Sequence, residues 1–170
     1  WPEVSRILKA RDILFISDEV ICGFGRTGQL FGSKTLGTEP DLITFAKAVT
    51  NGFQPLGGVL VSDKVASVIT AKGGEFAHGF TYSGHPIACA AAMATLDIMQ
   101  SENIFERVRD YAAPYMQKRW AELGEHPIVG HTRGLGMFGS LELVRNKETR
   151  ERLAPDQASG GVCRDLALEN

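Results

Sequence analysis

The chain has 170 residues, of which 44% are hydrophobic and 22% are charged, and these proportions are ordinary for a folded globular protein. Its formal net charge of −2 excludes a strongly basic surface for nucleic acid, and no run of about 18 apolar residues is present that would cross a membrane. The cysteines lack CxxC or metal-ligand spacing, which favours a reducing, cytoplasmic location over a disulfide framework: Cys22, Cys89 and Cys163.

The N-terminal part of the chain predicts a helix followed by two buried strands. Residues 1–11 have apolar side chains at helical spacing, and apolar runs predict strands at residues 13–18 and 42–46. A glycine-rich loop, residues 22–28, separates the two strands.

An acid and an amine stand at the ends of these two strands. The first strand ends in Asp18, and Lys47 follows the second. Neighbouring parallel strands would bring both side chains to the same edge of a sheet. This pair suits pyridoxal phosphate, because an amine forms a Schiff base with the cofactor aldehyde and a carboxylate keeps the pyridine nitrogen protonated.

Spacing alone leaves other interpretations of this pair open. A lysine at the end of a strand more often reaches solvent than performs chemistry. Asp18 is followed by Glu19, and because side chains alternate along a strand, only one of the two carboxylates faces a site. A solvated strand end or a metal site is an alternative for the two acids. The metal alternative is weak, because no histidine or cysteine stands beside them at ligand spacing.

Further along, the sequence predicts a third strand at residues 57–62 and a short helix at 63–69. The helix predicted at 87–99 has small or apolar side chains all round, so we expect it to be fully buried. Apolar positions continue at helical spacing through residues 103–123, with Pro114 inside the pattern. An interior proline removes a hydrogen bond and should kink or divide this helix.

The interrupted helix marks the predicted domain boundary. Residues 1–112 are assigned to part of a large domain and residues 113–170 to part of a small α+β domain. In the second part, residues 134–144 alternate like strands, and residues 156–169 predict a helix.

Three sequence runs carry a family resemblance: residues 17–28 (SDEVICGFGRTG), 43–48 (ITFAKA) and 78–86 (HGFTYSGHP). In their order and spacing they resemble the class III aminotransferases, which include the omega-amino acid:pyruvate transaminases, and the resemblance covers essentially the whole chain. It implies an α/β fold of type I, bound to pyridoxal 5′-phosphate. The large, mostly parallel sheet domain would be represented by its C-terminal half and the small domain by a truncated part.

The resemblance also implies roles for five residues. Lys47 would form the Schiff base and act as the general acid and base, while Asp18 would meet the pyridine nitrogen and Val20 would pack on the ring face. Phe80 and Thr81 would contact the cofactor, with Thr81 reaching the phosphate of the neighbouring subunit in a homodimer that shares its active sites. Without the resemblance, this threonine is equally well explained as a cap for the next helix.

The reaction that the resemblance implies is transamination, in which an amine or omega-amino acid gives its amino group to a keto acid, with pyruvate as the expected acceptor. Two alternatives remain. The same pair of side chains serves decarboxylases, racemases and aminomutases that use this cofactor. The chain is also compatible with an inactive remnant that only dimerises or binds a partner.

The ends of the chain predict that it is part of a longer protein. It begins at Trp1 without an initiator methionine, and it stops inside a predicted helix. We therefore expect the family's phosphate-binding loop, ring-stacking aromatic residue and substrate-binding arginine to lie outside this sequence.

Overall fold

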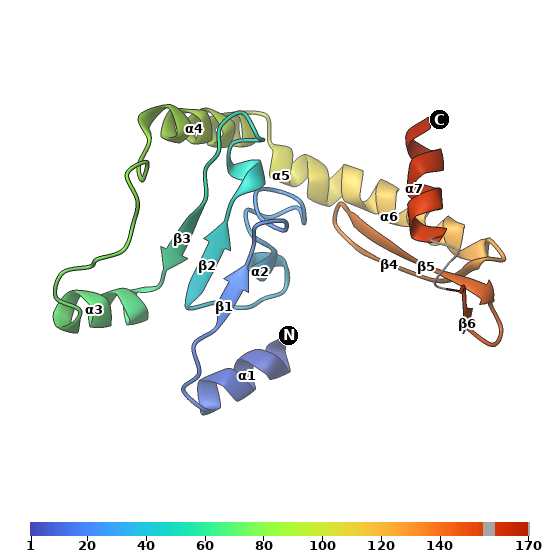
Figure 1. Cartoon of the computed structure of the whole chain (residues 1–170), viewed down its shortest axis with the longest axis horizontal. Helices are drawn as coiled ribbons and strands as arrows, with labels where there is room; N and C mark the ends of the chain where they lie inside the picture. Colours follow the sequence, from blue (N-terminus) through green and yellow to red (C-terminus); the bar gives the residue numbers. More distant parts are fainter. Residues whose placement is uncertain (155–158, 170) are drawn as a thin grey trace. The chain divides into compact units, whose positions relative to one another are not determined.

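The computed structural model describes residues 1–154 and 159–169. The chain divides into two units, Trp1–Tyr111 and Ala112–Asn170. Figure 1 labels the helices and strands of each unit along the chain. Among the described residues, no helix is both long enough and apolar enough to span a bilayer.

The first unit contains a sheet of three strands, β1 (Ile16–Asp18), β2 (Leu42–Phe45) and β3 (Gly58–Val61). β1 and β2 are parallel neighbours, with Asp18 opposite Thr44, whereas β2 and β3 are antiparallel. The three predicted strands are present, but the described sheet is mixed rather than mostly parallel. A parallel β3 would need a crossover, usually an α-helix, and the chain instead returns from β2 through the 3-10 turn η1 and a loop.

The helical elements of the first unit surround this sheet and the loops at its edge (Figure 1). They include α1 (Pro2–Ala10), α2 (Gly32–Thr35), the 3-10 turn η1 (Lys47–Val49), α3 (Asp63–Lys72), α4 (Pro86–Ser101) and α5 (Ile104–Arg107). The helices predicted at residues 1–11, 63–69 and 87–99 correspond to α1, α3 and α4.

The hydrophobic core of this unit is built around the glycine-rich loop. Phe24 packs edge-on against Phe31 and Phe45, with ring centroids 5.6 Å and 5.8 Å away. Val49 from η1 and Met99 from α4 are buried in the same cluster. The loop after β1 is therefore fixed by aromatic packing to β2 and by apolar packing to α4.

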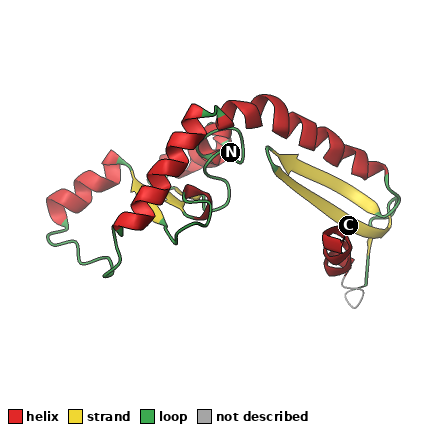
Figure 2. Ribbon diagram, turned by 90° about the horizontal axis from the view of Figure 1, so that it is seen from above, coloured by secondary structure: helices red, strands yellow, loops and turns green. Residues whose placement is uncertain are grey.

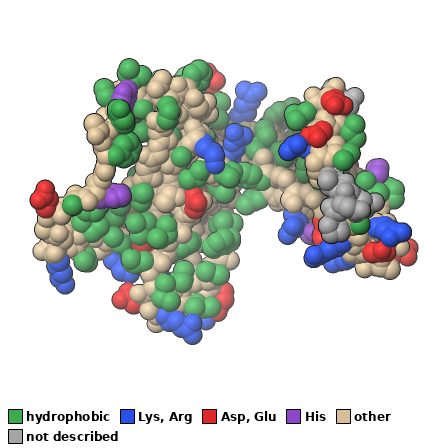
Figure 3. All heavy atoms as spheres, viewed as in Figure 1, with side chains coloured by type: hydrophobic (Ala, Val, Ile, Leu, Met, Phe, Trp, Pro, Cys, Tyr) green, Lys and Arg blue, Asp and Glu red, His purple; other side chains and the backbone are tan. Residues whose placement is uncertain are grey.

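Helix α4 is buried on one face only, which corrects the expectation of a fully buried helix. The buried positions recur at helical spacing: Ala88, Ala92, Thr95 and Met99. Ile87, Met93 and Ile98 are 62%, 59% and 53% exposed. The reason is that the described residues pack against α4 from the side of η1 and α5, so apolar side chains remain on the surface of the first unit (Figure 3).

Pro114 divides the long helical segment, as predicted. After α5, a π-helical turn covers Val108–Ala112, and α6 (Ala113–Glu122) then begins with Pro114 in its first turn. A proline is tolerated in a first turn because its missing N–H has no partner to lose there. The π turn therefore separates α5 from α6 directly before the proline.

The second unit places α6 along an antiparallel hairpin (Figure 2). Its other elements are η3 (Leu123–Glu125), β4 (Val129–Leu135), β5 (Phe138–Asn146), β6 (Glu151–Arg152) and α7 (Ser159–Glu169). The predicted strands fall within β4 and β5. The predicted final helix corresponds to α7 from residue 159 onward, and its expected start at residues 156–158 lies outside the described residues.

Two side chains of α6 attach this helix to the hairpin. The Gln117 amide donates to the carbonyl oxygens of Gly136 and Phe138 at 2.8 Å and 2.7 Å. The Trp120 indole donates to the Ser140 carbonyl at 3.2 Å. These bonds fix the helix over the turn of the hairpin, where β4 passes into β5.

Candidate active site

Asp18 and Lys47 lie at the same edge of the sheet in the first unit. Asp18 is the last residue of β1, and its partner in the parallel ladder, Thr44, stands three positions before Lys47. Both Asp18 and Lys47 are exposed. The lysine charge also helps to lower the pKa of Asp18, so the two groups are within electrostatic reach of each other.

The Asp18 carboxylate is held through one of its two oxygens. Oδ1 accepts a hydrogen bond from the Thr44 hydroxyl at 2.8 Å and another from the Val20 backbone N–H at 3.1 Å. The Thr44 bond is the main cause that lowers the pKa of Asp18, followed by the Val20 N–H. Asp18 is therefore an anion at neutral pH, and within the described chain its Oδ2 accepts no hydrogen bond.

Glu19 faces the opposite side of the strand and is only 2% exposed. Its carboxylate accepts backbone N–H bonds from Gly32 at 2.8 Å and Ser33 at 2.7 Å, and the Ser17 hydroxyl donates to it at 3.2 Å. It therefore fixes the start of α2 against β1. Sequence reasoning separated the two acids by alternation, but it did not identify this partner for Glu19.

Lys47 adopts an unusual backbone conformation. Its φ angle is +51°, in the left-handed region, directly after the extended Ala46. A residue with a side chain held in that region costs about 1–3 kcal/mol, and such strain clusters at functional sites. The chain changes at this residue from strand to 3-10 turn, so the amine emerges at the corner between β2 and η1.

A buried threonine closes the turn that follows Lys47. The Thr50 backbone N–H donates to the Lys47 carbonyl at 3.3 Å, and the Thr50 hydroxyl donates to the Gln54 carbonyl at 2.6 Å. Thr50 is 1% exposed. It thereby joins η1 to the loop before β3, a contact that the sequence pattern did not reveal.

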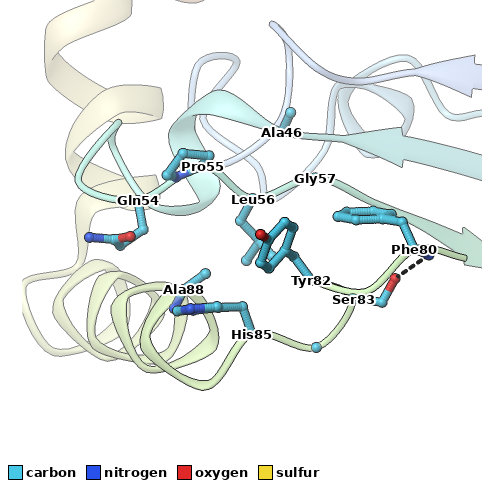
Figure 4. Close-up of a pocket in the computed structure, with 11 residues that line it drawn as sticks. Ala46, Gln54, Pro55, Leu56, Gly57, Phe80, Tyr82, Ser83, His85 and Ala88 are labelled. Carbon is cyan, nitrogen blue, oxygen red and sulfur yellow. Dashed lines mark hydrogen bonds between the residues drawn. The ribbon is translucent and has the colours of Figure 1, made fainter.

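A pocket of about 650 Å³ opens beside the residue that precedes Lys47 (Figure 4). One wall comes from Ala46 and the Gln54–Gly57 loop, and the other from the loop before α4 and its first turn. The residues that line it are Ala46, Gln54, Pro55, Leu56, Gly57, Phe80, Tyr82, Ser83, Gly84, His85 and Ala88. Phe80 thus lies on this pocket, whereas Asp18, Val20, Lys47 and Thr81 are not among its lining residues.

The loop before α4 has its own internal order. The Ser83 hydroxyl accepts the Phe80 backbone N–H at 3.1 Å, which Figure 4 draws as a dashed line. His85 caps α4, because its Nδ1 accepts the Ala88 backbone N–H at 3.4 Å. Thr81 is exposed, and the capping position that sequence reasoning offered it as an alternative is taken by the histidine.

The described residues contain no group of three or more histidine, cysteine, aspartate or glutamate side chains placed to hold a metal ion. This edge of the sheet offers an anionic carboxylate and a primary amine within electrostatic reach of each other. Beside them lies a partly aromatic pocket.

Residues 1–167 match the family model of the class-III aminotransferases. Since the match covers nearly the whole chain, the chain belongs to the class III aminotransferase family. The membership expected from three short motifs is thus confirmed, and so is the α/β class of the fold.

Relatives and solved structures agree with this assignment. The chain is 54% identical to the putrescine–pyruvate aminotransferase of Pseudomonas aeruginosa, over 100% of this chain and 37% of the relative. The (S)-enantioselective omega-transaminase of Thermomicrobium roseum superposes with a TM-score of 0.86 and 46% identity, over 92% of this chain and 35% of that one.

A third similar protein is the taurine:2-oxoglutarate aminotransferase of Bifidobacterium kashiwanohense, solved in complex with PLP and glutamate. It superposes with a TM-score of 0.84 and 39% identity, over 91% of this chain and 34% of that one. The chain thus spans about a third of the length of these relatives.

Proposed function

We propose that the protein is an aminotransferase that uses pyridoxal 5′-phosphate to move an amino group from an amine or omega-amino acid to a keto acid. The observation that carries the proposal is the pairing of Asp18 and Lys47 at one sheet edge, in a chain that matches the class III family over residues 1–167. An acid and an amine placed in this way are the two groups that the cofactor requires from the protein.

The described residues fit the cofactor. Asp18 is anionic with its Oδ2 open, so it can accept a hydrogen bond from the protonated pyridine nitrogen, and Lys47 presents an exposed amine nearby. When bound, pyridoxal phosphate supplies an aldehyde carbon and a ring that withdraws electrons from the substrate carbon. Lys47 would hold the cofactor through that aldehyde, and its free amine would be the group that carries the proton during transfer.

The remaining site assignments rest on the family motifs. Val20 packs on the ring face, next to the carboxylate that its own N–H helps to hold. Phe80 contacts the cofactor, and Thr81 reaches the cofactor phosphate of a second subunit, so the working enzyme is a homodimer with shared sites. The high exposure of Phe80, which is 72%, supports a surface that another chain covers.

The substrates are proposed by similarity. The 54% identity to a putrescine–pyruvate aminotransferase supports a terminal amine as donor and pyruvate as acceptor.

Residues 1–112 then form part of the large cofactor-binding domain and residues 113–170 part of the small domain. The free cysteines, with no disulfide in the described chain, support a cytoplasmic location: Cys22, Cys89 and Cys163.

The test is a visible absorbance spectrum of the full-length protein with pyridoxal phosphate, recorded before and after putrescine and again after pyruvate. We expect the band of the lysine-bound cofactor to bleach with the amine and to return with pyruvate, with alanine as product. Decarboxylation or racemisation without alanine would establish another reaction of the same cofactor. Absence of the band would remove the cofactor and favour a binding module.

Two lysine variants sharpen this test. Lys47→Ala should lose the band and all turnover, because no other amine occupies the end of β2. Lys72→Ala, on the exposed last turn of α3, is the matched control and should keep both. A Lys47→Ala enzyme that still transfers nitrogen would refute the assignment of the amine.

A further inference from the structure

Thr44 makes two distinct contacts with the segment that carries the acid of the proposed site. Its carbonyl oxygen accepts the Glu19 backbone N–H at 2.9 Å, and its hydroxyl donates to Asp18 Oδ1 at 2.8 Å. The first contact belongs to the strand ladder and needs only a backbone. The second needs the hydroxyl of a serine or threonine at this position.

We infer that Thr44 is a positioning residue, which holds Asp18 Oδ1 so that Oδ2 is the oxygen presented to the cofactor's ring nitrogen. The inference rests on the proposed function and concerns how the acid is oriented. Rotation about the last side-chain bond of an aspartate exchanges its two oxygens. Two donors on Oδ1, the Thr44 hydroxyl and the Val20 N–H, oppose that rotation.

The strand environment gives no other reason for a hydroxyl at this position. Thr44 is half-buried in the middle strand, where the apolar residues Ile43 and Phe45 precede and follow it in sequence. Valine has the same branched shape and suits a strand equally well. A half-buried hydroxyl is costly unless it is hydrogen-bonded, and its bond to a charged oxygen offsets that cost.

The hydroxyl also leaves the amine available for chemistry. In the described chain Lys47 and Asp18 form no direct ion pair, although the lysine charge reaches the carboxylate. A bare carboxylate next to an ammonium group would attract it into such a pair. With Oδ1 already occupied by two donors, Asp18 is stabilised without Lys47, and the amine is free to reach the cofactor aldehyde.

The experiment uses two matched pairs in the full-length enzyme loaded with cofactor: the natural threonine against Thr44→Val, and Thr44→Ser against Thr44→Ala. Each pair differs by one hydroxyl. The two readouts are kcat/KM for the amine half-reaction and the ¹⁵N resonance of ring-labelled cofactor, which reports whether the pyridine nitrogen is protonated. Thr132→Val, on β4 of the second unit, is the strand control.

Loss of the hydroxyl should lower kcat/KM about tenfold, the size expected for one hydrogen bond to a charged group. The ¹⁵N resonance of the valine and alanine variants should move toward that of a neutral ring. The serine variant and Thr132→Val should stay within about twofold of the natural enzyme, a difference below the energy of one such bond.

Three outcomes would overturn the inference. Valine and alanine variants with natural rates and an unmoved resonance would show that the hydroxyl does not act on Asp18. A serine variant as impaired as alanine would assign the effect to the methyl group and hence to packing. Failure of the natural protein to bind the cofactor would instead remove the proposed function itself, and the inference with it.

Discussion

Asp18 and Glu19 are adjacent in sequence and opposite in environment. Asp18 is exposed and receives donors on a single oxygen, whereas Glu19 is buried and receives donors from two backbone N–H groups and a hydroxyl. The alternation of a strand separates them, and their neighbours then decide their uses. The acid at the sheet edge is available to a ligand, and the one behind it holds the fold.

The lowered pKa of Asp18 predicts how its charge contributes to stability. Because its Thr44 bond lowers the folded pKa below the unfolded value, which is about 3.9, the contribution is complete above that value. It is lost as pH falls through the lower, folded pKa. Asp18→Asn should therefore be less stable than the natural protein at neutral pH, and the difference should disappear in acid.

The measurement is urea unfolding of both proteins at several pH values between neutrality and strong acid. Asp97→Asn, which removes an exposed carboxylate from α4, controls for the change in surface charge. A difference between the natural protein and Asp18→Asn that persists unchanged into strong acid would contradict this account.

At the scale of elements, the short helix α2 depends on a residue far outside it. Glu19 supplies acceptors to the N–H groups of Gly32 and Ser33, which have no partners within the helix. A four-residue helix is too short to be stable by itself. The loop after β1, and with it the aromatic core, is therefore attached to the strand by one buried carboxylate.

Glu19→Gln should destabilise the protein by about 1–3 kcal/mol, because the new amide group turns a donor toward backbone donors. Glu3→Gln is the matched control, since its ion pair with Arg6 lies exposed on α1, and its midpoint should stay close to that of the natural protein. Denaturant midpoints of the two variants provide the comparison. Equal midpoints would mean that the loop is held by packing alone.

The contact between α6 and its hairpin predicts a second effect on stability. A Cβ atom on Gly139 would overlap the Trp120 ring, so Gly139→Ala should cost about 1–3 kcal/mol through overpacking. At Gly161, inside α7, a Cβ would meet nothing within 4 Å. Gly161→Ala should therefore stabilise by up to about 1 kcal/mol, and thermal unfolding of both variants tests the pair. A harmless Gly139→Ala would indicate that the indole moves aside.

The sequence patterns predicted the helices and strands more accurately than the side-chain contacts between them. Apolar runs gave the strands, and a single proline located the division of the long helix. Side-chain hydrogen bonds were beyond such patterns, because Thr44 meets Asp18 only through the register of two strands, and Thr50 meets Gln54 only through a folded turn. The roles of Asp18, Val20, Lys47, Phe80 and Thr81 remain predictions from family motifs.

At the scale of the whole chain, the main departure from expectation is the amount of exposed apolar surface. Large apolar side chains of α4 and of the loop before it are more than half exposed, among them Ile87, Met93, Phe80 and Tyr82. Composition predicted an apolar helix correctly, but it could not indicate how much of the chain would be available to cover it. Exposed apolar side chains in such numbers favour contacts with other protein surface.

The 170-residue chain by itself should therefore self-associate. We expect size-exclusion chromatography to give an apparent mass above that of a monomer, decreasing on dilution as apolar contacts are lost. Met93→Glu should reduce the association, and Lys72→Glu, on the exposed last turn of α3, is the control. Elution as a monomer at all concentrations would contradict this expectation.

At Lys47, the residue that best suits the left-handed backbone differs from the residue that the proposed chemistry needs. Glycine adopts φ near +51° at little cost, whereas a residue with a Cβ loses about 1–2 kcal/mol there. Lys47→Gly should accordingly have a higher denaturant midpoint than Lys47→Ala, and both variants lack the amine. Equal midpoints would show that the turn relaxes around alanine. The residue that would fold most easily here is inert, so selection for stability alone would drive this position away from catalysis.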